Sequence, residues 1–268
     1  MKLFRHVADD VRRRMVTIHH AVRLVTSAAT ICACLLGGKS LHAADMATEF
    51  DQANKLYEEG KFRDAAEAYG KILSSGTSST PLLFNLGNAQ FKAGNVGLAI
   101  AAYRQAAQLS PRDADLNANL QFARSRVTGP TLKSNWLHRS INSLTTNEWT
   151  LLAIVPAWLW LALLAARQLK PALKGPLRTW IFTAGVASLL TCAALAFVLN
   201  HRFNEHTVVV TARDAVARYG PLAESQSAFT AADGAELSLV DTKNDWFQVT
   251  DGSKTFGWLK TNVVVRGN

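Results

Sequence analysis

The amino-acid sequence predicts a multidomain protein with an all-α helical repeat region, two helices that cross a membrane, and a small C-terminal all-β barrel. Three observations predict this fold class. Residue types recur at an offset of 34 between positions 46 and 113. Two later stretches of 18 and 22 residues carry no charge. Short alternating segments separated by turn residues follow position 206. These patterns are typical of helical repeats, membrane helices and β-strands, respectively.

The distribution of charge limits the class of partner. Of the 268 residues, 49% are hydrophobic and only 18% are charged, below the ~25% of an ordinary soluble domain. The net charge of +9 arises in residues 1–43 and 128–206, each with seven basic and two acidic side chains. Residues 44–127 carry nine of each sign, and residues 207–268 carry six basic and seven acidic side chains. Because neither globular region is strongly basic, we expect no nucleic-acid partner.

Residues 1–43 have the pattern of an export signal peptide. Arginines precede an apolar stretch at 24–36, and Leu41-His42-Ala43 fits a small-residue cleavage site. Translation from Met15 would give a more usual signal length, so the sequence leaves open whether the protein starts at Met1 or Met15. The flanking residues fit a twin-arginine or lipoprotein signal less well.

The scarcity of cysteine and histidine argues against catalysis. Cys32 and Cys34 lie in the leader and Cys192 lies in an apolar stretch, so the globular regions contain no disulfide, thiolate metal site or cysteine nucleophile. The histidines after the leader are His138, His201 and His206, all beside the apolar stretches. Histidine is the usual general base and metal ligand near neutral pH. We therefore predict a protein that is not an enzyme and that needs no cofactor or metal.

The repeat comprises two units, 46–79 and 80–113. Self-comparison aligns Gly60 with Gly94, Ala65 with Ala99, and Tyr69 with Tyr103. Each unit predicts a helix, a turn at the glycine and a second helix, because glycine tolerates the positive φ that ends many helices. Pro111 is expected to end the second helix of its unit. Residues 114–127 predict a capping helix, which covers apolar surface that two repeats leave exposed.

The second unit resembles a tetratricopeptide repeat (TPR). The resemblance lies in Asn85-Leu86-Gly87-Asn88-Ala89, Gly94, Ala99, Tyr103, Ala106 and Pro111. In the first unit, Gln52 and Ala53 replace the Leu-Gly pair and Thr77 replaces the proline. The resemblance implies a solenoid whose first helices line a concave protein-binding groove.

The side chains that the resemblance places in this groove are Phe50, Asn54, Tyr57, Phe84, Asn88 and Phe91. Core packing is the alternative role for the aromatic members. The basic residues of a carboxylate clamp are missing, so the sequence favours a more apolar partner segment, for which Phe and Tyr are suitable anchors.

Residues 149–166 and 179–200 are each long enough, as helices, to cross a hydrocarbon core of ~30 Å. Two buried helices of a soluble domain are the alternative. The segment between them, 167–178, holds four basic residues and no acid, which is typical of a cytoplasmic loop. Together with the leader, this predicts an inner-membrane protein with residues 44–127 and 207–268 both in the periplasm.

A linker at 128–148 precedes the first span. Within the second span, Ala184, Ser188, Cys192 and Ala196 recur every four residues. Small side chains let helices approach closely in lipid, so we expect this stripe to pack on the first span or on a partner.

The C-terminal segment resembles bacterial SH3-like domains. The resemblance lies in Arg218-Tyr219-Gly220-Pro221, Gly234, Trp246, Val249 and Gly257-Trp258. It implies a small barrel, and some relatives bind cell-wall peptides. Tyr219 and Trp258 are the candidate peptide-binding face, and packing in the barrel is the alternative role for Trp258 and Trp246.

The order of parts, with Asn147-Glu148-Trp149 opening the first span, resembles the BatE-type family of the bacterial aerotolerance operon. The resemblance implies a membrane-anchored scaffold in stress response, with membrane protein partners that bear von Willebrand factor A domains. The alternative function is a peptidoglycan-binding module that recruits envelope enzymes.

Overall fold

The computed structural model describes all residues except 1–39, 129–135, 171–174, 205, 253–254 and 268. Most of the leader and part of the linker therefore lie outside the described residues. The chain divides into two units between Gln52 and Ala53.

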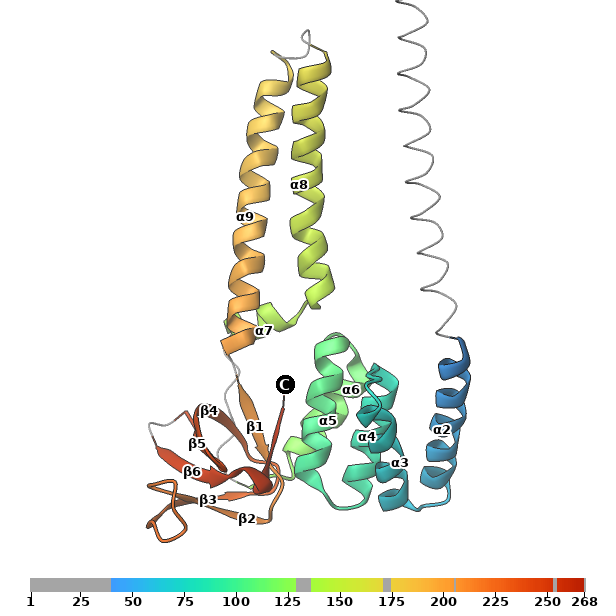
Figure 1. Ribbon diagram of the computed structural model, residues 1–268, viewed down its shortest axis with the longest axis vertical. Coiled ribbons are helices and arrows are strands. Elements are labelled where there is room, and N and C mark those ends of the chain that lie inside the picture. The colour runs from blue at the N-terminus through green and yellow to red at the C-terminus, as the bar shows by residue number, and fades with distance from the viewer. Residues whose placement is uncertain (1–39, 129–135, 171–174, 205, 253–254, 268) are drawn as a thin grey trace, which may run out of the picture. The chain divides into compact units, whose positions relative to one another are not determined.

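The repeat region is a series of antiparallel helices (Figure 1). Their bounds are α2 Ser40–Glu58, α3 Phe62–Ser74, α4 Thr80–Lys92, α5 Val96–Leu109 and α6 Ala114–Arg124. Gly60 and Gly94 have φ angles of 77° and 88°, which confirms the predicted role of these glycines in ending a helix. The second helix of the second unit ends just before Pro111, also as predicted.

The core of the repeats consists of small and aromatic side chains from successive helices. Ala65 and Ala99 are fully buried where helices cross, and Tyr69 and Tyr103 fill the space between helices. On α6, Leu116, Leu120 and Ala123 are buried together. Asp113 caps this helix by accepting a hydrogen bond from the Leu116 amide at 3.0 Å.

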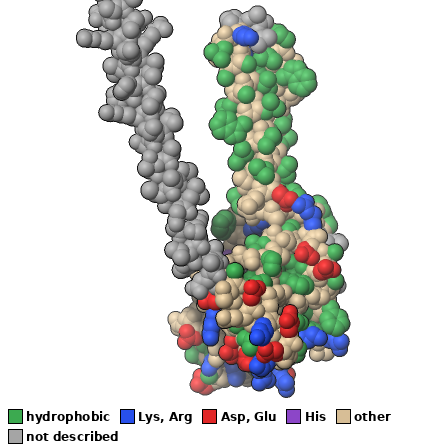
Figure 2. Space-filling view, turned by 90° about the vertical axis from the view of Figure 1, so that its right-hand side faces the viewer, with side chains coloured by type: hydrophobic (Ala, Val, Ile, Leu, Met, Phe, Trp, Pro, Cys, Tyr) green, Lys and Arg blue, Asp and Glu red, His purple; other side chains and the backbone are tan. Residues whose placement is uncertain are grey.

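Two long apolar helices follow the short helix α7 Trp136–Asn142. They are α8 Thr146–Leu169 and α9 Leu177–Asn204, which run side by side in opposite directions (Figure 1). Only 6% and 17% of their apolar windows are buried, whereas the core helix of a soluble protein is mostly buried. Figure 2 shows hydrophobic side chains along the visible face of this pair. Both helices could therefore cross a membrane.

The start of α8 is fixed by hydrogen bonds. Thr145 and Glu148 form a reciprocal capping box. Arg202 on α9 donates to the carbonyl oxygens of Ile141 and Leu144 at 3.2 and 2.8 Å, so α9 is joined to α7 and to the turn that precedes α8.

The described part of the C-terminal segment is an antiparallel sheet of seven strands in the order β3-β2-β6-β5-β4-β1-β7. The strands are β1 Thr207–Val210, β2 Asp214–Arg218, β3 Ser227–Ala232, β4 Glu236–Lys243, β5 Trp246–Thr250, β6 Phe256–Lys260 and β7 Val264–Arg266. Val208 and Val210 belong to the core of this sheet, whereas Val209 between them belongs to the core of the repeats. This division follows from the two-residue alternation of side chains along a strand.

Candidate functional site

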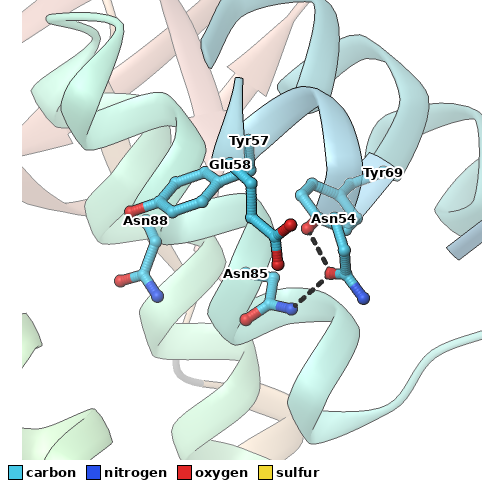
Figure 3. Close-up of a pocket in the computed structure, with 6 residues that line it drawn as sticks. All are labelled: Asn54, Tyr57, Glu58, Tyr69, Asn85 and Asn88. Carbon is cyan, nitrogen blue, oxygen red and sulfur yellow. Dashed lines mark hydrogen bonds between the residues drawn. The ribbon is translucent and has the colours of Figure 1, made fainter. Parts of the chain in front are cut away.

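A pocket of about 390 Å³ opens between the helices of the repeat region. Tyr57 and Glu58 extend into it from α2, and Asn85 and Asn88 extend into it from α4 (Figure 3). The complete lining is Asn54, Tyr57, Glu58, Tyr69, Asn85 and Asn88. The pocket thus presents amides, phenols and one carboxylate.

A hydrogen-bonded trio positions the asparagine at this pocket. The Asn54 Oδ1 atom accepts one hydrogen bond from the Tyr69 hydroxyl at 2.6 Å and a second from Asn85 Nδ2 at 3.1 Å (Figure 3). The trio spans three helices: α2, α3 and α4. It therefore joins the two helices of one repeat to the first helix of the next.

The same trio recurs one repeat later. Asn88 Oδ1 accepts from the Tyr103 hydroxyl at 2.7 Å and from Asn119 Nδ2 at 3.1 Å. Each member lies 34 residues after its counterpart. We call the two trios the asparagine–tyrosine ladder. Because the ladder uses the asparagine oxygens, the remaining hydrogen-bonding capacity of Asn54 and Asn88 is that of their Nδ2 donors.

The structure brings three of the six predicted groove residues to the pocket: Asn54, Tyr57 and Asn88. Three further lining residues were not predicted. Two of them, Tyr69 and Asn85, belong to the ladder, and the 34-residue offset that aligns Tyr69 with Tyr103 also aligns Asn85 with Asn119. No comparable signal marks Glu58, because Lys92 stands at the equivalent position.

The predicted phenylalanines do not line this pocket. Phe84 is half-buried against the repeat core, with its ring centroid 6.1 Å from that of Tyr103. Phe91 also packs on the core and lies 5.5 Å from the ring of Phe122. Phe50 is half-buried on α2, in the unit that ends at Gln52. For Phe84 and Phe91, the packing role was the alternative that the sequence left open.

Burial dominates the electrostatics of the phenols at the ladder. It raises the pKa of Tyr57 and, against the effect of a hydrogen bond, the pKa of Tyr69. The pKa of Tyr103 is raised strongly for the same reason. These hydroxyls stay protonated at neutral pH, and those of Tyr69 and Tyr103 donate the hydrogen bonds of the ladder. Among the described residues, no group of three or more His, Cys, Asp and Glu side chains could hold a metal ion. The pocket lining therefore consists of side chains that can donate and accept hydrogen bonds.

The second candidate face lies on the sheet. Arg218 in β2 pairs with Trp258 in β6, so Trp258 lies opposite the residue that precedes Tyr219. Tyr219 is 68% exposed, and Trp258 is half-buried. Successive side chains alternate between the two faces of a strand, so this register places Trp258 on the face of Arg218 and does not by itself bring the two predicted rings together.

The predicted stripe of small residues on α9 is buried in part. Ala184 and Ser188 are buried, whereas Cys192 and Ala196 are exposed. Steps of four residues exceed the helical turn and rotate the stripe by about 40° each time. The buried positions on α9 are Ile181, Ala184, Ser188 and Val198.

Comparison with protein families identifies both the helical repeats and the C-terminal sheet. A tetratricopeptide repeat model matches residues 50–114, and a bacterial SH3 domain model matches residues 212–264. A comparison with curated proteins found no match. Both kinds of region are typically binding modules rather than catalytic ones. The chain therefore contains a tetratricopeptide repeat region and a bacterial SH3 domain, separated by two apolar helices that could span a membrane.

Proposed function

We propose that this protein is a non-enzymatic membrane-anchored scaffold whose repeat groove and SH3-like domain bind protein partners at the outer face of a bacterial inner membrane. The observation that carries the proposal is the pocket at the asparagine–tyrosine ladder. The ladder orients Asn54 and Asn88 at a pocket that Tyr57 and Glu58 also line. Groups held in place before binding lose little entropy when a peptide docks.

The exposed apolar surface of α8 and α9 supports the membrane anchor. The basic residues between the two spans are Arg167, Lys170, Lys174 and Arg178. Short basic loops stay in the cytoplasm, so the repeats and the sheet both lie in the periplasm. The signal-peptide pattern at 1–43, which falls mainly outside the described residues, is consistent with export.

Resemblance to the BatE-type family supplies the finer proposal about partners. It suggests a membrane protein with a von Willebrand factor A domain, in a complex of the aerotolerance type. In that setting the protein brings two partner-binding surfaces to one membrane face, which raises their effective concentration for a common partner.

The test is photocrosslinking from the full-length chain in its native membranes. A photoreactive residue at Tyr57 should give a discrete protein adduct, because this side chain lines the pocket. The control is the same residue at Glu67, which is exposed on α3 and lies outside the pocket lining. Absence of an adduct at Tyr57, or equal yields at both positions, would contradict a binding groove.

A cell-wall role is the second candidate, favoured by the bacterial SH3 match and the exposed Tyr219. In this case the full-length protein in detergent should be retained on purified peptidoglycan. Tyr219→Ala should reduce retention, whereas Val240→Ala, a change at another exposed apolar residue of the sheet, should not. Retention that does not respond to Tyr219→Ala would rule out this face as the binding surface.

A further inference from the structure

The outward face of α5 differs from that of its counterpart α3. Positions 34 residues apart are equivalent in the repeat, yet exposed Arg63 on α3 becomes buried Gly97 on α5. Likewise, exposed Glu67 is replaced by buried Ala101. The repeat fold alone does not require these changes, since the first unit folds without them. An additional structure must therefore cover α5.

The SH3-like domain provides that cover. An ideal Cβ atom at Gly97 would lie 2.1 Å from the carbonyl oxygen of Val210 in β1. Val209 is fully buried and belongs to the same hydrophobic cluster as Ile100 and Ala101 on α5. From the other side, a Cβ atom at Gly234 would lie 2.5 Å from Cγ2 of Val127. The close approach at Gly97 and Gly234 leaves no room for an intervening solvent layer.

A carboxylate of the SH3-like domain caps α5. Asp233 accepts hydrogen bonds from the Val96 amide at 3.1 Å and the Gly97 amide at 2.9 Å. The residue at the N-cap position, Asn95, makes no capping bond, and its Nδ2 donates instead to Gln90. The amides at the start of a helix need an acceptor, and an anion also favours this end of the helix dipole.

A buried ion network provides a second polar contact. Glu236 at the start of β4 is 5% exposed. Its Oε1 atom lies 3.2 Å from an Arg104 nitrogen on α5 and 2.9 Å from an Arg124 nitrogen on α6. A buried carboxylate without these cations would be strongly destabilising, so the network specifies one docking geometry.

We infer that the SH3-like domain is a fixed part of the repeat array, so that residues 80–127 and 207–268 form one rigid body into which the α8–α9 hairpin is inserted. The occupant of the outward face of α5 is this domain and not an external partner. A partner then meets the ladder pocket and the Tyr219 face at a fixed separation. The two halves of the body must also share one compartment. This inference needs no partner, so its test can fail independently of the proposed function.

The test uses thiol accessibility in the full-length protein in detergent, with the three native cysteines replaced by alanine. Val209→Cys reports on docking because this position faces the repeat core, whereas Val249→Cys reports on the core of the sheet. Both thiols should react slowly with a maleimide. Gly97→Arg introduces the residue found at the equivalent position of the first repeat, where the repeat tolerates it. It should speed the labelling of the thiol at position 209 about tenfold or more by opening the interface.

The control is Gly70→Arg, which places the same side chain on α3 where a Cβ atom meets nothing within 4 Å. It should leave the thiol at position 209 protected. If Gly97→Arg raises the labelling rate at position 209 more than at position 249, the result supports rigid docking. If the change raises the labelling rate at both positions, the result supports a single cooperative body. Rapid labelling at position 209 without the Gly97→Arg change, or no response to that change, would overturn the inference.

Discussion

Asn88 belongs to the asparagine–tyrosine ladder and also faces the pocket. Its Oδ1 atom joins Tyr103 and Asn119, and the residue also lines the pocket. Replacement by leucine removes an acceptor from two donors at once. A buried donor that loses its partner costs about 1–3 kcal/mol.

We therefore expect Asn88→Leu to lower the free energy of unfolding by about 1–3 kcal/mol, measured by urea denaturation of the detergent-solubilised chain. The control is Asn95→Ala, because Asn95 is exposed and does not cap α5. Exposed substitutions usually change stability by less than about 0.5 kcal/mol. Equal losses from both changes would contradict a structural role for the ladder.

The buried hydroxyl of Tyr103 predicts sensitivity to alkaline pH. Burial raises the pKa of this group above its unfolded value. The folded state therefore keeps a proton that the unfolded state loses above about pH 10, so stability falls as the pH rises beyond that value. Tyr103→Phe should make the decline between about pH 9 and 11 shallower. Tyr57 and Tyr69 have raised pKa values too, so some decline should remain; identical slopes for both proteins would exclude a contribution from Tyr103.

At the scale of the helix, Gly87 and Gly70 give opposite expectations for the same change. An added Cβ atom at Gly87 on α4 would lie 2.5 Å from Cε1 of Tyr103, whereas at Gly70 on α3 it meets nothing within 4 Å. Gly87→Ala should destabilise the protein by about 1–3 kcal/mol through overpacking. Gly70→Ala should stabilise it by up to about 1 kcal/mol, because alanine favours a helix. Thermal unfolding of both variants measures the difference, and shifts of the same sign would contradict close contact between α4 and α5.

The elements that could be predicted from sequence are those with strong periodicity. The 34-residue offset located the turns at Gly60 and Gly94, and uncharged length located α8 and α9. Strands β2 and β3 were not predicted because their alanine-rich segments, Asp214–Arg218 and Ser227–Ala232, lack a clear run of β-branched residues.

The candidate site could be predicted only in part from the sequence. Position within the repeat identified Asn54, Tyr57 and Asn88, but it could not distinguish a ring in the pocket from a ring in the core, such as Phe84. The docking of the sheet on α5 depends on contacts more than 100 residues apart in sequence, such as that between Arg124 and Glu236. No local pattern encodes such a pairing, although the replacement of arginine by Gly97 at the equivalent repeat position marks the surface where it occurs.

For the whole molecule, the membrane topology is the decisive prediction. Single cysteines at Glu67 in the repeats and Thr242 in the sheet should both react with a membrane-impermeant maleimide in spheroplasts, since both residues are exposed. A cysteine at Gly175, between the two apolar helices, should react only after the membrane is permeabilised. Opposite accessibility of positions 67 and 242 would contradict two crossings and the docking of the sheet on α5.

The two ion pairs that Glu236 makes with Arg104 and Arg124 restrict how this architecture can evolve. The two arginines come from consecutive helices, so duplicating a unit between α5 and α6 would pull one of them away from the shared carboxylate. Duplication ahead of α4 disturbs neither guanidinium. Repeat arrays that descend from this one should therefore gain or lose units on the α2 side, while α5 and α6 keep their spacing.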